Sequence, residues 1–390
     1  MTGTNKTPLL RKPGVQTLIA SLTCILLGLA VGYIALCMIN ASGAGEAMGL
    51  VLKNFMKANS TKQQMKNLGS TLVKTAPLVM CSLSVLFAYK AGLFNIGAAG
   101  QYVVGAGAAL YLALGLHMPW YVCVVGSIIA GAILGSISGI LKAYRNVNEV
   151  ISGIMLNWIS LYTVNTILTQ VKDPSSPETL PLAKANPAAI LPSLGMNEFF
   201  GGNKYVGLAL PMALVFAVLV WVVLNKTRLG YELRATGLNK QAAKYCGMRE
   251  QFNIILTMAL AGALAGLGAS MLYLTDYARW EVTQSSVPGM GFNGIAAAFL
   301  GGLNPIGAIF SSFFIQHITD GGAFLSSLKV PVIENGIEVS RNVYCSQTSD
   351  FISSIIIYLC GFVFFIRLMI TRALDKREER KNAQLKGGKQ

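Results

Sequence analysis

Uncharged amide side chains are the groups through which the apolar stretches of this chain could recognise a ligand. They are Asn95, Gln101, Asn157, Asn165, Asn293 and Asn304. An amide offers donors and an acceptor, which suit the hydroxyl groups and base edges of a neutral solute, although a single amide is more often a hydrogen bond between helices. Asn95 and Asn293 lie where glycines interrupt the helical pattern, and irregular backbone inside a membrane is buried in protein or lines a wet cavity. These two are therefore the stronger candidates.

Charged side chains are scarce in the same stretches. Those present lie near the predicted ends of the apolar runs: Lys74, Glu149, Asp320, Asp350, Arg367 and Arg372. His317 is then the one titratable group expected at depth, where a hydrogen-bonded packing role is favoured over lining a pathway. A carrier driven by protons or sodium is expected to bury a carboxylate, and a carrier of ions needs a counter-charge. The pattern favours a neutral polar solute and an energy source outside this chain.

The elements that position these amides must lie in lipid. Of the 390 residues, 53% are hydrophobic and 12% are charged, and the mean hydropathy is +0.55, which means more apolar surface than a soluble core hides. Apolar runs reach the roughly 20 residues that a helix needs to cross a bilayer, and the alternating segments typical of a barrel do not occur. The chain is therefore predicted to be an all-α integral membrane protein.

About ten transmembrane helices are predicted. They cover residues 15–40, 70–89, 101–116, 119–141, 149–171, 205–225, 252–274, 285–301, 305–324 and 350–372. The eighth is short and holds Pro288 and several glycines, so we expect a broken helix that still counts as a crossing. With the N-terminus inside, residues 1–14, the loop 226–250 and the basic tail 373–390 are cytoplasmic, and 15–372 form the membrane domain. Cytoplasmic loops favour Lys and Arg, which accounts for the net charge of +15 without any nucleic acid.

The chain shows no chemistry of its own for hydrolysing ATP. It has no Walker A pattern, no catalytic side-chain set within the spans and no metal-ligand spacing, so we expect no catalytic residue, metal or bound cofactor, with ATP and magnesium used by a partner. The loop 226–249 holds a short helix-forming stretch between Gly237 and Gly247, with small side chains at Ala242 and Ala243. This stretch is either a knob for a groove on a partner or an ordinary basic loop.

Four motifs in a fixed order carry a resemblance to a known family. They are TLVKTAPL at 71–78 leading into AGLFNIGAAGQ at 91–101, NEVIS at 148–152 with MLN at 155–157, the stretch 233–247, and GFNGIA at 291–296 through 304–305. The sequence resembles the permease subunits of ABC importers in the branched-chain amino acid, ribose and nucleoside permease superfamily. It is most similar to the nucleoside or simple-sugar branch that works with basic-membrane-protein-type binding lipoproteins. One departure is Ala99, where the family commonly has an acidic residue.

The resemblance implies the ABC importer permease fold of ten helices, with both termini inside, in a bacterial cytoplasmic membrane. It also implies that the loop after residue 226 inserts into a cytoplasmic ABC ATPase. The coupling residues are then Glu232, Arg234, Gly237, Ala242, Ala243 and Gly247. A second permease, identical or homologous, and an extracytoplasmic substrate-binding lipoprotein are the other expected partners.

The expected function is translocation of a small neutral solute by alternating access, and the favoured solute is a nucleoside. Phe94 and Phe292 are candidates for stacking on a base or sugar face. The candidate hydrogen-bonding groups are Asn95, Gln101, Asn157 and Asn293. The alternatives are a simple-sugar importer of the same kind, a facilitator that needs no ATP, and a membrane scaffold that transports nothing.

Overall fold

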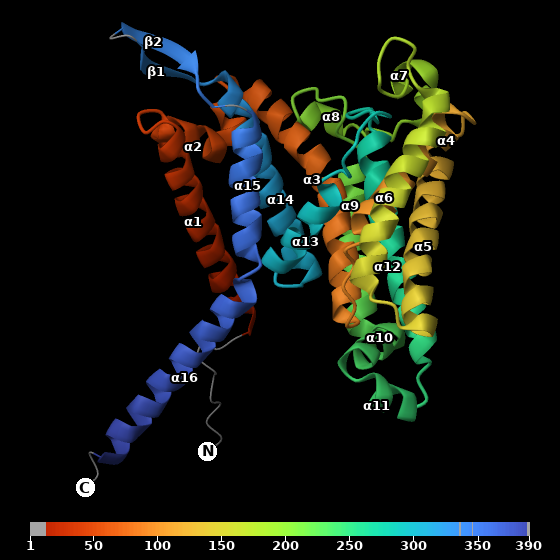
Figure 1. Ribbon diagram of the computed structural model, residues 1–390, viewed down its shortest axis with the longest axis vertical. Helices are drawn as coiled ribbons and strands as arrows, with labels where there is room; N and C mark the ends of the chain where they lie inside the picture. The colour runs from red at the N-terminus through yellow and green to blue at the C-terminus, as the bar shows by residue number, and fades with distance from the viewer. Residues whose placement is uncertain (1–12, 335–336, 345, 388–390) are drawn as a thin grey trace. The chain divides into compact units, whose positions relative to one another are not determined.

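The computed structural model is mostly helical (Figure 1). It describes residues 13–334, 337–344 and 346–387. The chain divides into two compact units, one formed by Leu50–Gly321 and the other by Met1–Gly49 with Gly322–Gln390. Among the described helices, six are long and apolar enough to cross a membrane: Gly14–Ile39, Thr61–Lys90, Trp120–Arg145, Glu149–Val171, Ala209–Lys226 and Glu250–Tyr273. Each agrees with a span predicted from the sequence.

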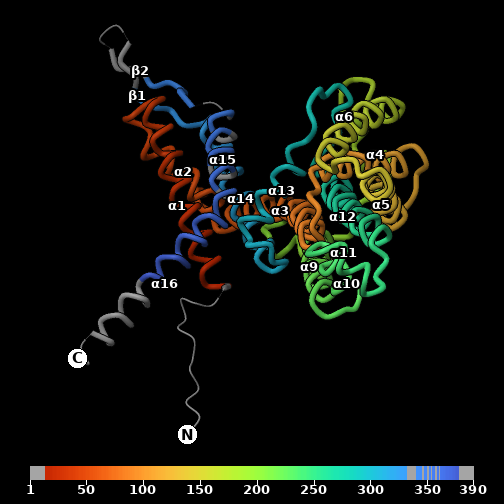
Figure 2. Tube along the Cα trace, turned by 60° about the horizontal axis from the view of Figure 1, so that its bottom comes forward, coloured from red at the N-terminus to blue at the C-terminus, as the bar shows by residue number. Residues whose placement is uncertain are grey.

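Helix α12 (Glu250–Tyr273) forms the centre of the larger unit. It packs against α3 (Thr61–Lys90), α4 (Ala98–Leu114) and α5 (Trp120–Arg145), as Figure 2 shows. Where α5 and α12 cross, a side chain added at Gly131 would overlap the carbonyl oxygen of Gly262, and one added at Gly262 would overlap that of Gly131. Glycines therefore bring the two helix backbones into direct contact, as small residues do in membrane helix pairs.

The other helices of this unit surround that centre. α6 (Glu149–Leu168), continued by η3 (Thr169–Val171), packs on α4; α9 (Ala209–Lys226) packs on α3; and α13 (Met290–Leu300) packs on α3 and α4. α14 (Pro305–Ala323) follows α13. Short helices lie at opposite ends of the unit (Figure 1). They are α7 (Leu182–Ala185), η4 (Pro187–Ala189) and α8 (Met196–Phe199) at one end, and α10 (Arg228–Leu238) and α11 (Lys240–Tyr245) at the other.

The smaller unit combines helices with a β-hairpin. Its elements are α1 (Pro13–Ile39), η5 (Phe324–Ser327), β1 (Lys329–Glu334), β2 (Ile337–Asn342), α15 (Ser346–Cys360) and α16 (Val363–Gly387). α2 (Ala44–Lys53) and η2 (Asn54–Lys57) lead from this unit into the larger one. The strands pair antiparallel, from Lys329 opposite Asn342 to Glu334 opposite Ile337. α1 packs on α15 and α16, and the Tyr344 hydroxyl donates to the Asn40 carbonyl at 2.8 Å.

The structure bears on three sequence-based expectations. α13 has 11 residues, so it is about 17 Å long and shorter than the roughly 30 Å of hydrocarbon, which agrees with the broken helix expected at 285–301. The single span at 350–372 is wrong, because α15 ends at Cys360 and α16 begins at Val363 and continues past residue 372 to Gly387. The hairpin means that the chain is not entirely α-helical. Hydropathy reports apolar length, and it is insensitive to a break between two apolar helices.

Candidate functional site

A reciprocal pair of buried amides joins the end of α3 to the start of α4. Asn95 Nδ2 donates to Gln101 Oε1 at 2.8 Å and to Ser84 Oγ at 3.0 Å, and Gln101 Nε2 donates to Asn95 Oδ1 at 3.1 Å. Asn95 is 0% exposed and Gln101 is 1% exposed. Unpaired amides at such depth would be costly, so each side chain satisfies the other. The pair holds the irregular segment 91–97 in one conformation.

Asn157 of α6 binds the backbone of the same region. Its Oδ1 accepts from the Gly100 N–H at 2.7 Å, and its Nδ2 donates to the Ile96 carbonyl at 3.1 Å. Gly100 permits this approach, because a side chain there would lie 2.8 Å from Asn157 Cα. Asn157 therefore attaches α6 to the first turn of α4 and to the segment before it.

The predicted residues of α13 lie beside this region. A side chain at Gly291 would lie 2.6 Å from the Ala99 nitrogen, so the first turn of α13 packs on the first turn of α4. Phe292 is 41% exposed and Asn293 is half-buried. The half-buried Phe94 ring lies 6.4 Å from the ring of Phe299, also on α13. The six predicted solute residues thus come from segments that meet at the start of α4, with Phe292 presenting the most open surface.

The remaining amides have structural partners. Asn165 accepts from the Trp280 indole N–H at 2.9 Å and donates to the Gln284 carbonyl at 2.9 Å. Asn304 accepts from the Ile306 N–H at 2.9 Å, in the first turn of α14. These contacts agree with the interpretation that most amides in membrane helices serve packing.

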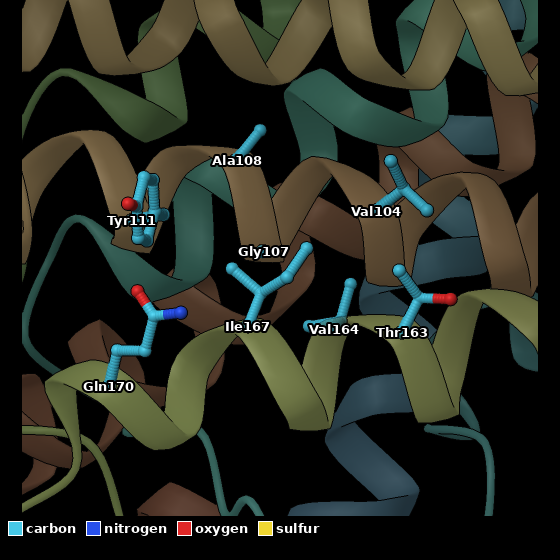
Figure 3. Close-up of a pocket in the computed structure, with 8 residues that line it drawn as sticks. All are labelled: Val104, Gly107, Ala108, Tyr111, Thr163, Val164, Ile167 and Gln170. Atoms are coloured by element: carbon cyan, nitrogen blue, oxygen red, sulfur yellow. The ribbon is translucent and has the colours of Figure 1, made fainter.

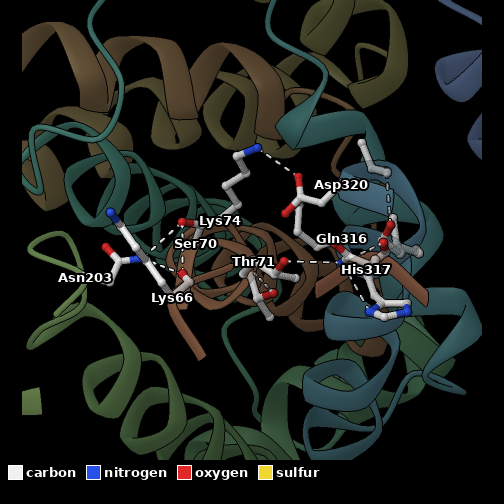
Figure 4. Close-up of polar contacts among 12 residues, drawn as sticks. Lys66, Ser70, Thr71, Lys74, Asn203, Gln316, His317 and Asp320 are labelled. Atoms are coloured by element: carbon white, nitrogen blue, oxygen red, sulfur yellow. Dashed lines mark hydrogen bonds and ion pairs between the residues drawn. The ribbon is translucent and has the colours of Figure 1, made fainter. Parts of the chain in front are cut away.

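His317 of α14 has the packing role favoured by the sequence. Its Nε2 lies 2.9 Å from the Leu52 carbonyl and its Nδ1 lies 3.2 Å from Asn54 Nδ2 (Figure 4). A carbonyl oxygen only accepts, so Nε2 carries the proton and Nδ1 accepts from the amide. Asn54 Nδ2 also donates to the His317 carbonyl at 3.0 Å. This set of bonds attaches α14 to the connection between α2 and α3.

Sequence reasoning missed an ion pair between α3 and α14. Lys74 Nζ lies 2.8 Å from Asp320 Oδ1, which also accepts from Gln316 Nε2 at 2.9 Å (Figure 4). The sequence places each charge near the end of a predicted span and does not pair them. The two residues are 246 positions apart, and nothing in the sequence links them.

The predicted coupling loop forms two short helices, α10 and α11. Thr227 Oγ1 accepts from the Gly230 N–H at 3.1 Å and Asn239 Oδ1 accepts from the Ala242 N–H at 3.0 Å, so each helix begins with a side-chain cap. Within α10, Glu232 pairs with Arg228 at 2.8 Å, and Arg234 Nε donates to the Gly230 carbonyl at 3.3 Å.

The two predicted small residues of this loop face different ways. Ala242 is exposed, whereas Ala243 is 4% exposed and packs inward. Gly247 follows α11 with a positive φ of 79°, a conformation that glycine adopts without strain. The most exposed apolar side chains here are Leu238 at 89% and Tyr245 at 91%, which sequence reasoning did not single out.

Gly237 of α10 touches the segment that carries the amide pair. A side chain at Gly237 would lie 2.6 Å from the Gly92 nitrogen, and one at Gly92 would lie 2.7 Å from Gly237 Cα. Gly92 has a positive φ of 74°. Asn253 Nδ2 also donates to Thr236 Oγ1 at 3.0 Å, which ties α10 to α12. The loop and the segment 91–97 are therefore in direct backbone contact.

A cavity of about 400 Å³ lies between α4 and α6 (Figure 3). It is lined by Val104, Gly107, Ala108, Tyr111, Thr163, Val164, Ile167 and Gln170. Its walls are mostly apolar, and none of the predicted solute residues lines it. Within the described part of the chain, no group of three or more His, Cys, Asp or Glu side chains is placed to hold a metal.

A mostly helical domain with several helices that can cross a membrane, a buried cluster of uncharged amides and a two-helix loop packed on the backbone of Ala91 and Gly92 is typical of a transport permease. The chain is a member of the family described as branched-chain amino acid transport system / permease component, whose profile matches residues 67–360. It is accordingly a transport subunit and a multi-pass protein of the bacterial inner membrane.

Relatives of this chain include several ABC transporter permeases. It is 31% identical over 363 residues to the guanosine ABC transporter permease protein NupP of Bacillus subtilis, covering 92% of this chain and 97% of the relative. It is 31% identical to the nucleoside ABC transporter permease protein NupB of Lactococcus lactis, over 79% of this chain and 82% of the relative. A glucose ABC transporter permease protein of Haloferax volcanii is 28% identical, over 93% of this chain and 92% of the relative. No solved structure matches the chain.

Proposed function

We propose that this chain is the membrane-spanning subunit of an ATP-driven importer for nucleosides. The observation that carries the proposal is the similarity, over nearly the whole of both chains, to a permease named for guanosine. The permease named for nucleosides in Lactococcus lactis adds to it. The uncharged amide cluster at the start of α4 suits a solute that carries no net charge.

The proposed assembly contains two permeases, identical or homologous, cytoplasmic ABC ATPases and an extracytoplasmic substrate-binding lipoprotein. In the proposed orientation, with both termini inside, α10 and α11 lie in the cytoplasm. The exposed Leu238 and Tyr245 side chains then dock on the ATPase. The backbone contact of Gly237 with Gly92 supports a direct path from that docking site to the segment 91–97.

Transport then proceeds by alternating access. In the state described here, Asn95 and Gln101 bond to each other. A shift of segment 91–97 relative to α4 would separate them and expose amide donors and acceptors to a nucleoside. The open Phe292 ring offers an aromatic face for the base. Closure restores the reciprocal pair and releases the solute, since one set of amide bonds replaces the other.

The glucose permease among the relatives favours a second candidate, a simple-sugar importer. Guanosine and glucose share one chemical feature, which is a set of vicinal hydroxyl groups on a sugar ring. The proposed substrate is therefore a solute with vicinal hydroxyl groups, and a nucleoside is the preferred candidate.

Uptake into membrane vesicles tests the proposal. The vesicles contain this chain with its candidate ATPase, partner permease and binding protein, and the labelled solutes are guanosine, uridine and ribose. ATP-dependent uptake of a nucleoside supports the proposal, and uptake of ribose alone supports the sugar importer. Saturable nucleoside uptake that continues without ATP would contradict the proposal in favour of a facilitator, and no uptake of any solute would favour the scaffold.

A further inference from the structure

The ion pair between Lys74 and Asp320 has more hydrogen-bonding capacity than its structural contacts use. Asp320 Oδ1 accepts from both Lys74 Nζ and Gln316 Nε2, while Oδ2 has no hydrogen-bond partner among the described residues. The Lys74 ammonium can donate three hydrogen bonds, and it bonds to the side chains of Asp320 and Tyr277, which leaves one donor for a ligand. Its side chain is 32% exposed and that of Asp320 is 13% exposed. The pair therefore offers an open acceptor beside an accessible donor.

The pair is not the only contact that attaches α14 to its neighbours. Asn54 bonds to His317, one turn before Asp320, at 3.0 and 3.2 Å. The donors and acceptors of Asn54 and His317 are bonded to each other and to neighbouring groups, whereas the ion pair keeps a donor and an acceptor for a ligand. Charged side chains in membrane proteins are costly to keep and usually mark a functional site.

An aromatic face completes the arrangement. Lys74 Nζ lies 5.4 Å from the centre of the Tyr277 ring, which is half-buried and packs edge-on against Tyr205 at 5.2 Å. Tyr277 lies in the segment between α12 and α13. Three separate parts of the chain thus bring a cation, a carboxylate and an aromatic ring together. Ligand sites combine aromatic walls with a few polar or charged groups that fix the orientation of the ligand, and a sugar ring with vicinal hydroxyls offers a counterpart to both.

The position of the pair along α3 suits a site on the solute's route. Near the start of α3, the Asn203 amide donates to the Lys66 carbonyl at 2.8 Å (Figure 4). α3 ends at Lys90, and the residues that follow it contact α10. Lys74 lies about midway between these ends. Under the proposed orientation, a solute arriving from outside reaches this level before it reaches the amide cluster at the start of α4.

We propose that Lys74 and Asp320 form a binding subsite for the vicinal hydroxyl groups of the transported solute. Asp320 Oδ2 accepts from one hydroxyl or from two neighbouring ones, Lys74 Nζ donates to a hydroxyl or ring oxygen, and Tyr277 covers the sugar face. The inference rests on the proposed function, because it concerns the solute of that importer.

The test compares guanosine with 2′,3′-dideoxyguanosine and 2′,3′-dideoxyadenosine, deoxy analogues that lack both vicinal hydroxyl groups, in the full vesicle system. Asp320→Asn keeps the shape of the side chain and removes its charge. We expect guanosine uptake to fall by about tenfold relative to the deoxy analogues, because only guanosine loses a charge-assisted hydrogen bond. The substrate preference of the binding protein is the same in vesicles with the wild-type and with the variant permease. A change in the ratio of guanosine uptake to analogue uptake therefore comes from the permease.

Glu178→Gln is the matched control. It breaks the ion pair with Arg279, a 3.1 Å contact in a loop, and should leave the ratio unchanged. Equal losses for guanosine and its deoxy analogues in Asp320→Asn would show a purely structural pair and overturn the inference, as would no loss at all. If this variant fails to reach the membrane, Lys74→Gln carries the same test. Wild-type vesicles that take up no nucleoside would contradict the proposed function. Failure of the proposed function is thereby distinguished from failure of the subsite inference, which appears only in the variant.

Discussion

At the residue scale, the amide pair is the most constrained part of the candidate site. Asn95 and Gln101 are nearly inaccessible and exchange hydrogen bonds within one short segment. A buried amide that loses its partner keeps the cost of its desolvation. The same feature that makes the pair suitable for a transport cycle therefore makes it important for stability.

Asn95→Ala should lower the free energy of unfolding by about 1–3 kcal/mol, since Gln101 is left with an unsatisfied buried amide. Thermal unfolding of the detergent-purified complex measures the change. Asn59→Ala, at an exposed position before α3, is the control and should have little effect. Equal unfolding temperatures for the two variants would contradict a stabilising role of the pair.

At the element scale, glycines set how closely the helices approach. The contact of Gly131 with Gly262 brings the backbones of α5 and α12 together, and that of Gly92 with Gly237 joins segment 91–97 to α10. The first contact holds the centre of the larger unit. The second lies between the loop expected to meet the ATPase and the residues expected to meet the solute.

Gly262→Ala should destabilise the protein by about 1–3 kcal/mol, because the added methyl group overlaps a backbone carbonyl that cannot rotate away. The matched control is Gly45→Ala in α2, where an added side chain meets nothing within 4 Å. Helix propensity predicts a small gain there. Thermal unfolding of both variants in detergent is the measurement, and comparable stability would show that the α5–α12 contact tolerates extra volume.

Gly237→Ala should uncouple ATP hydrolysis from transport. The methyl group forces α10 away from Ala91 and Gly92, so movement of the loop no longer reaches segment 91–97. We expect nucleoside uptake to fall at least about tenfold while ATP hydrolysis by the reconstituted complex continues, a loss equivalent to about 1.4 kcal/mol or more. Gly49→Ala, which meets no neighbour within 4 Å, is the control. Uptake and hydrolysis that fall in parallel would argue against a transmitting contact.

At the scale of the whole molecule, the larger unit has distinct ends. α10 and α11 lie at one end and α7 and α8 at the other (Figure 1). The end with α10 and α11 exposes Leu238 and Tyr245, and the opposite end exposes Phe199 at 78%. An importer binds different partners at its two ends. Substitution of these exposed side chains tests the binding of each partner separately.

Tyr245→Glu should prevent the ATPase from co-purifying with the permease, because a carboxylate replaces an apolar side chain at the expected interface. The isolated permease should remain folded, since Tyr245 is 91% exposed. Affinity purification from detergent extracts measures the ATPase retained. Phe199→Glu, at the opposite end, should retain it fully, and a Tyr245→Glu variant that also retains it would place the ATPase elsewhere.

Much of this architecture could be predicted from hydropathy, because the need to cross lipid fixes helix length and composition. The neighbourhood of Asn95 and Gln101 was also predictable, since the residues are close in sequence. The ion pair of Lys74 with Asp320 was not, because it depends on how two distant helices pack. The break between α15 and α16 escaped prediction because both helices are apolar where they meet.

The glycine contact between α5 and α12 also limits how this permease can move. With a carbonyl oxygen set against each glycine, neither helix can slide along the other without an atomic collision. The Ser127 hydroxyl adds a clamp, donating to the Gly266 carbonyl at 2.6 Å. The two helices are therefore expected to move together as one rigid body, which leaves relative movement during the proposed transport cycle to shorter elements such as α13.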